Sequence, residues 1–258
     1  MGKFFTVDVK PTVPASLQHA GAFGAGEVLF DWTAFQVPKG SSCLRSITAL
    51  VRPKGDTTPT ANAFAFTLVF SKTNTQSLGT VNSTVDNRPS NDLLGIHEFF
   101  TGQFGPTSMN STMVATSTVQ GDNEGASAPL VLTPTPTTGD NVGYDTLYVG
   151  GIGASTSWDF SSINAIAEAG AAEAASTQAI TMDGADMDVR EHFIAGDVLH
   201  IGTSVGSPAA DSVIGTVESV SNASTGPINL TAVSETALVD GDILYNIHPI
   251  KLILSFER

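Results

Sequence analysis

Cysteine is almost absent from this chain, since Cys43 is the only one among 258 residues. One thiol cannot form an internal disulfide, so the disulfide-stapled scaffolds of small secreted proteins are excluded. Because free cysteine is usually buried, Cys43 is predicted to be a core residue rather than a nucleophile. Long apolar runs are also lacking, and none approaches the roughly 18 residues that a membrane-spanning helix needs.

Positive charge is scarce and unevenly placed. The chain carries 11 Lys and Arg against 25 Asp and Glu, and no Lys or Arg occurs from residue 89 to 189. Residues 1–88 have a net charge of +3, whereas the remainder has a net charge of −17. Such a chain repels nucleic acid and anionic membranes, so neither is an expected partner. Two interpretations stay open. Either the acidic residues simply form a solubilising surface, or the near-neutral region of residues 1–88 docks on a partner while the acidic remainder faces away.

Recognisable histidine motifs of metal sites are missing as well. The five histidines form no HExxH or His-x-His pair. The best candidate for a metal is an acidic cluster formed by Asp183, Asp186 and Asp188. Its spacing does not match the calcium-binding EF-hand loop, so a solvated acidic turn is the alternative. No cofactor is predicted.

Two carboxylates beside tryptophans raise the question of sugar chemistry. Asp31 precedes Trp32, and Asp159 follows Trp158. Since adjacent residues on a strand point to opposite faces of a sheet, Asp31 and Trp32 are not expected to share a site. A glycosidase needs a pair of carboxylates, one on each side of the glycosidic bond that it cleaves. This pattern does not by itself provide such a pair.

What the chain does have is strand-forming sequence interrupted by 25 Gly and 13 Pro. With only 14% charged residues and few amphipathic helical patterns, this composition predicts an all-β protein. Residues 64–70 alternate strictly, which predicts that Phe64, Phe66, Leu68 and Phe70 face one core.

Two nearly identical phrases mark the last quarter of the chain. Residues 195–200 (AGDVLH) and 240–245 (DGDILY) each place Gly-Asp before an aliphatic-Leu-aromatic run, which is typical of a tight turn leading into a strand. Residues 213–220 and 227–233 lie between them and also read as strands. Together they predict a compact unit of four or five short strands, roughly residues 179–247.

The chain then adds residues 249–256 (PIKLILSF), a strand too hydrophobic to be left exposed. It resembles residues 46–51 and 64–70 in character, so we expect it to return to the first domain. The predicted organisation is a β-sandwich or jelly-roll-like main domain of residues 1–175 plus 248–258, with residues 176–247 inserted as a small β-barrel domain.

Residues 29–40 (LFDWTAFQVPKG) and 46–55 (SITALVRPKG) resemble virion structural proteins of tailed bacteriophages, particularly those of marine cyanobacterial phages. The series 196–199, 214–217, 228–232 and 241–245 is similar to small β-barrel modules of phage decoration and fibre proteins. The likeness covers about half of the chain, through phrases rather than one diagnostic motif.

The resemblance implies a non-enzymatic capsid decoration or cement protein, made in the host cytoplasm and located on the outer surface of the virion. Its implied partners are the major capsid protein and neighbouring copies of itself. The basic residues of the first domain are the candidates for docking: Lys3, Lys10, Lys39, Arg45, Arg52 and Lys54. The alternatives are a tail-fibre or receptor-binding module for host surface polysaccharide, and a carbohydrate-active enzyme.

Overall fold

The computed structural model describes residues 3–53, 63–86, 91–105, 112–118, 130–132, 144–156, 158–160, 165–166, 178–180, 192–203, 210–221, 227–238 and 242–258. In these ranges the protein is nearly all β-structure, which confirms the predicted fold class. In the described part of the chain, no helix has the length and apolar character needed to cross a membrane.

The strands of the larger body are β1 (Phe4–Val9), β2 (Val28–Pro38), β3 (Ser42–Val51), β4 (Phe66–Ser71), β5 (Leu93–Phe99), β6 (Phe104–Gly105), β7 (Met113–Thr118), β8 (Leu130–Leu132), β9 (Tyr144–Gly153) and β16 (Ile250–Glu257). The smaller body contains β10 (Ala165–Ile166), β11 (Ala179–Ile180), β12 (Val198–Thr203), β13 (Val213–Val220), β14 (Ile228–Leu230) and β15 (Ile243–Asn246). The helical segments are α1 (Ala15–His19) and a short 3₁₀ turn, η1 (Thr101–Gln103).

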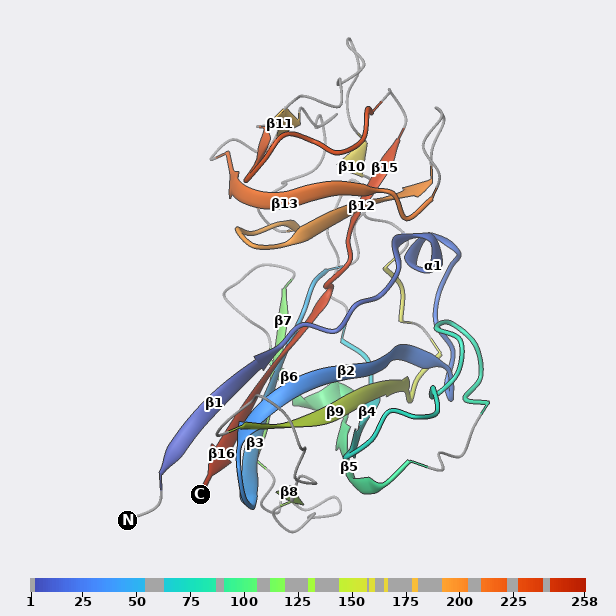
Figure 1. The fold of residues 1–258 in the computed structure, drawn as a ribbon. Coiled ribbons are helices and arrows are strands. Elements are labelled where there is room, and N and C mark those ends of the chain that lie inside the picture. The colour runs from blue at the N-terminus through green and yellow to red at the C-terminus, as the bar shows by residue number, and fades with distance from the viewer. Residues whose placement is uncertain are drawn as a thin grey trace.

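The larger body is a sandwich of two antiparallel sheets (Figure 1). One sheet has the order β1-β16-β3-β7-β6, with β8 also paired to β3, and the other has the order β2-β9-β4-β5. Side chains from both sheets form one buried hydrophobic cluster. Phe66, Leu68 and Phe70 are fully buried in it, as their alternation predicted.

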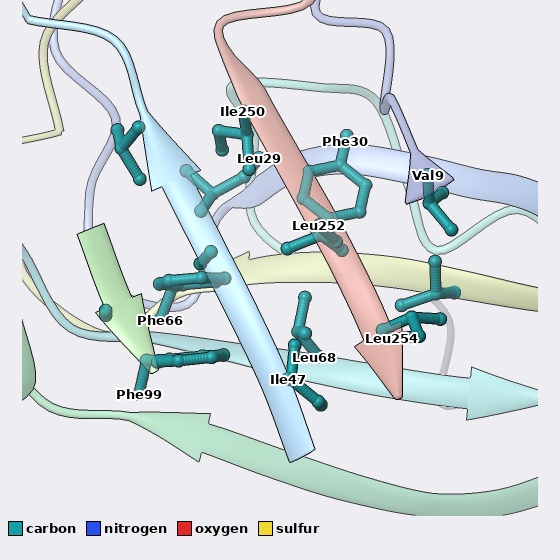
Figure 2. Close-up of a cluster of buried hydrophobic side chains, with 14 of the residues drawn as sticks. Val9, Leu29, Phe30, Ile47, Phe66, Leu68, Phe99, Ile250, Leu252 and Leu254 are labelled. Carbon is teal, nitrogen blue, oxygen red and sulfur yellow. The ribbon is translucent and has the colours of Figure 1, made fainter. Parts of the chain in front are cut away.

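The C-terminal strand β16 lies between β1 and β3, two hundred residues away in sequence. Phe5 pairs with Phe256 on one side, and Leu252 pairs with Ala49 on the other. This confirms the prediction that the last strand returns to the first domain. Figure 2 shows Ile250, Leu252 and Leu254 from β16 among residues of the facing sheet. These side chains are fully buried, and each contributes about 1.5–3 kcal/mol.

The smaller body is built on a six-stranded sheet with the order β10-β15-β12-β13-β14-β11. It encloses a second hydrophobic cluster that includes Leu199, Ile201, Leu230 and Leu244. The first of the twin turns is present, because Gly196 adopts a positive φ of 86° just before β12. Gly241 of the second turn lies outside the described residues. Closure of this sheet into a barrel stays a prediction.

The N-terminal arm connects the two bodies. Val13 belongs to the first hydrophobic cluster, whereas Ala15 of α1 belongs to the second. Val13 N donates to Ile247 O at 2.8 Å. The buried Gln18 donates to Val13 O and to Asn246 O at 2.8 and 2.9 Å. Although α1 falls in the predicted main domain, it therefore packs against the smaller body.

The domain boundaries predicted from sequence differ from this arrangement at a second place. β10 pairs with β15, so residues 165–166 belong to the second sheet although they precede residue 176. Phe160 still belongs to the first cluster. The chain thus passes from one body to the other between residues 160 and 165, while the predicted boundary at 175 lies outside the described residues.

Replacing one core residue of β16 tests how strongly this strand holds the sandwich together. We expect Leu252→Ala to lower the free energy of unfolding by about 3 kcal/mol, because it leaves a cavity in the core. Ile253→Ala, one residue further along on the partly exposed outer face, is the matched control and should cost about 1 kcal/mol. Urea unfolding measures both. Equal losses would contradict the buried pairing of β16.

Candidate functional site

The six basic residues proposed for docking occupy different environments. Lys3 and Lys39 are exposed, and Lys54 lies outside the described residues. Lys10 donates to Gly196 O at 3.3 Å. Arg45 pairs with Glu257, its Nε donating to Oε2 at 2.6 Å. Arg52 pairs with Asp197 in the smaller body. They are therefore not one patch, and Arg52 holds the two bodies together.

Lys3, Lys39, Arg45 and Arg258 gather at one end of the sandwich, here called the basic end. Main-chain hydrogen bonds of 3.0 and 2.9 Å join residues 3 and 258, and the Arg258 guanidinium donates to Lys39 O at 2.5 Å. Arg45 reaches Glu257, the residue that precedes Arg258. Phe4 of β1 pairs with Glu257 of β16, and its side chain is 75% exposed. Arg258 was not among the residues selected from sequence, because only folding brings the chain's last residue beside its third.

The junction between the bodies centres on the buried carboxylate of Asp197. Its Oδ2 accepts hydrogen bonds from Arg52 at 3.2 Å, from the Ile194 backbone at 2.9 Å and from Asn246 Nδ2 at 2.8 Å. Burial raises the pKa of Asp197 above its usual range, and the neighbouring Arg52 opposes this rise. Asp197 comes from the turn before β12, so the Gly-Asp of the first twin phrase is both a turn and a contact between bodies.

Lys10, His200 and His248 lie near one another where β15 passes into β16. His248 Nε2 lies 3.5 Å from Thr12 Oγ1. Burial, with Lys10 and His200 nearby, lowers the pKa of His248 to about 4. Burial also lowers the pKa of His200, against the opposing effects of Asp211 and Glu235. Two neutral imidazoles therefore lie at the junction at neutral pH.

His97 and Cys43 lie on two different strands of the larger body. His97 is buried on β5, neither of its ring nitrogens has a hydrogen-bond partner among the described residues, and burial lowers its pKa. Cys43 is partly buried on β3. Within the described ranges, no group of three or more His, Cys, Asp or Glu side chains is placed to hold a metal ion. The acidic cluster Asp183, Asp186 and Asp188 lies outside those ranges.

Asp31 and Trp32, expected on opposite faces, lie in the same open pocket. The pocket has a volume of about 450 Å³ and is lined by Thr12, Pro14, Asp31, Trp32, Thr33, Ala34 and Val81. The register of β2 against β9 explains the difference. Phe30 pairs with Gly151 and Thr33 with Val149, so three steps on β2 oppose two on β9. This β-bulge interrupts the alternation, and the expectation that the two side chains are separated is wrong.

Trp158 and Asp159 do not form an equivalent site. Trp158 is fully buried, its Nε1 donates to Ala65 O at 3.0 Å, and its ring packs against Phe64 and Phe66. Its indole is a core side chain with no face for a ligand. Asp159 does not line the Asp31 pocket, so within the described residues that pocket contains one carboxylate and not the pair that glycoside hydrolysis requires.

Comparisons with models of protein families, with curated proteins and with solved structures found no match. Three features of the molecule bear on its function: the basic end, the junction and the open pocket.

Removing Arg52 should strongly destabilise the protein. Arg52→Met leaves the buried Asp197 without its ion-pair partner, and we expect the free energy of unfolding to fall by about 3 kcal/mol. The double variant Arg52→Met/Asp197→Asn should recover part of this loss. Arg45→Met, which breaks the exposed pair with Glu257, is the control and should change stability little. Urea unfolding of the four proteins tests the prediction, and an Arg52 effect no larger than the Arg45 effect would refute it.

His248 should make stability depend on pH. Because its pKa is about 4 in the folded protein and about 6.5 in an unfolded chain, the unfolded state binds a proton first as the pH falls. Stability from this group is complete above about pH 6.5 and declines toward pH 4. We expect His248→Gln to flatten this decline, measured by urea unfolding at intervals between pH 7.5 and 4. An unchanged slope would assign the pH dependence to other groups.

Proposed function

We propose that this protein is a non-enzymatic virion structural protein, a capsid decoration protein that binds the outer surface of a major capsid protein lattice through its basic end. The observation that carries the proposal is the separation of charge along the molecule. Lys3, Lys39, Arg45 and Arg258 lie together at one end of the sandwich, with Glu257 as the acidic side chain paired among them.

The smaller body has the opposite charge. Residues 191–250 contain no Lys or Arg, and their acidic residues are Glu191, Asp197, Asp211, Glu218, Glu235, Asp240 and Asp242. In Figure 1, the C-terminus and the start of β1 lie at one end of β16, and the sheet of the smaller body lies beyond the other end of β16. An acidic lattice surface would attract the basic end and repel the smaller body, so one orientation of docking is favoured.

The basic end also offers contacts other than charge. Phe4 is 75% exposed there, and exposed aromatic and Arg side chains are common at protein interfaces. β1 is an outer strand whose described pairing is with β16 alone, so its other edge can accept a further strand. The Arg52–Asp197 pair and the buried Gln18 link the two bodies, which supports a smaller body held out from the lattice in a fixed direction.

Charge reversal at the basic end tests the proposal. The assay is co-sedimentation with expanded heads assembled from the major capsid protein encoded in the same genome. We expect Lys39→Glu and Lys3→Glu each to weaken binding about fivefold or more at low salt, because each replaces attraction by repulsion. Lys72→Glu carries the same charge change at the Lys72–Asp92 pair and should bind like the wild type. Failure of the wild-type protein to sediment with heads would exclude the proposal.

A further inference from the structure

We propose that the open pocket beside β2 is a binding site for a neutral saccharide, in which Trp32 provides a stacking surface and Asp31 accepts hydrogen bonds from sugar hydroxyls. The pocket lies between the outer strand β2 of its sheet and the N-terminal arm, which contributes Thr12 and Pro14. This site is separate from the basic end, so the proposal does not depend on capsid binding.

Both side chains are held in place before any ligand arrives. Asp31 Oδ2 accepts from Ser77 Oγ at 2.6 Å, and Asp31 Oδ1 accepts from the Leu78 backbone at 2.9 Å. The Trp32 indole Nε1 donates to Gln76 O at 2.7 Å. One short segment, residues 76–78, thus fixes the two pocket residues. A site ordered in advance loses less entropy on binding than one that must be assembled.

Gly150 on β9 makes room for this arrangement. A Cβ at residue 150 would lie 2.3 Å from Leu78 Cδ1 and 3.4 Å from Trp32 Cε3. Glycine therefore lets the Leu78 side chain lie directly on the sheet and the indole lie close beside it. Together with the bulge in β2, this close approach brings the tryptophan and the carboxylate to one surface.

The chemistry of the lining favours a neutral sugar. Sugars present apolar C–H faces to an indole and hydroxyl groups to polar side chains, and the pocket combines Trp32 with Asp31, Thr12 and Thr33. The pocket has a volume of about 450 Å³ and is open to solvent, so a bound sugar would keep part of its surface in water. The described residues of the lining include a carboxylate and no Lys or Arg, so an anionic sugar or a phosphate would be repelled.

A cationic ligand fits less well. Quaternary ammonium groups are usually bound in cages of several aromatic rings, and the lining formed by described residues contains one such ring. Both Asp31 oxygens already accept hydrogen bonds, which disperses the charge that would attract a cation while leaving lone pairs for hydroxyl donors. The polar groups therefore suit uncharged hydroxyls better than an ammonium group.

The protein has two tryptophans, and only Trp32 can report on this pocket, since Trp158 is fully buried in the core. Binding can therefore be followed by two-dimensional ¹H–¹⁵N NMR of the two indole N–H signals. The ligands are methyl glycosides of glucose, galactose, mannose, rhamnose and N-acetylglucosamine, with glucuronic acid and choline as charged comparisons. We expect at least one neutral glycoside to shift the Trp32 signal saturably and to leave the Trp158 signal in place.

Three variants locate the site. Trp32→Ala should weaken binding at least about fivefold, the size expected for loss of one aromatic contact. Ala34→Arg adds bulk at an exposed position of the lining and should do the same without altering the core, which covers the case in which Trp32→Ala does not fold. Tyr144→Ala removes an aromatic that is 51% exposed and does not line the pocket, so it should bind like the wild type.

The proposal fails if no neutral glycoside shifts the Trp32 signal, if choline or glucuronic acid binds more tightly than every neutral glycoside, or if Ala34→Arg binds as well as the wild type. All measurements use the isolated protein. Their outcome is therefore independent of the capsid-binding assay, and either proposal can fail alone.

Discussion

The structure depends on one C-terminal segment, β15 followed by β16, that serves both bodies. β15 pairs within the smaller sheet, and after three intervening residues β16 enters the sandwich between β1 and β3. The buried side chains of β16 alternate with partly exposed ones along its whole length. Phe160 belongs to the core of the sandwich, and the next described strand of the sandwich along the chain is β16, so the segment that completes the first sheet follows the smaller body in sequence.

Polar contacts at the junction then hold the two bodies in one position relative to each other. The covalent connections could still act as hinges, yet Arg52 donates across the junction to the buried carboxylate of Asp197, and Asn246 donates to the same carboxylate from within the smaller body. Gln18 adds two more bonds from the N-terminal arm. Charged hydrogen bonds with little solvent exposure are costly to break, since the carboxylate would be left buried without its partner. The separation of charge between the ends of the molecule therefore becomes a fixed property of its shape.

At the open pocket, the rule that side chains alternate between the two faces of a strand failed, because β2 contains a bulge there. Alternation correctly placed Phe66, Leu68 and Phe70 in the core, because β4 pairs with β9 in continuous register. The same rule separated Asp31 from Trp32, and there it was wrong, because β2 gains one residue relative to β9 between Phe30 and Thr33. Nothing in the residues of β2 marks this bulge by itself. It depends on the partner strand, on Gly150 and on the segment of residues 76–78 that contacts both side chains.

The all-β class, the return of the last strand and the uneven charge could be predicted from the amino-acid sequence, because composition, hydrophobic character and charge are properties of the residues alone. Which cations are exposed at the basic end, and which, like Arg52, form ion pairs inside the molecule, depends on the folded structure. The folded structure also packs α1 and β10 with the smaller body and brings a tryptophan and a carboxylate into one pocket. These outcomes depend on which distant segments become neighbours, and register and packing across the whole fold set those contacts.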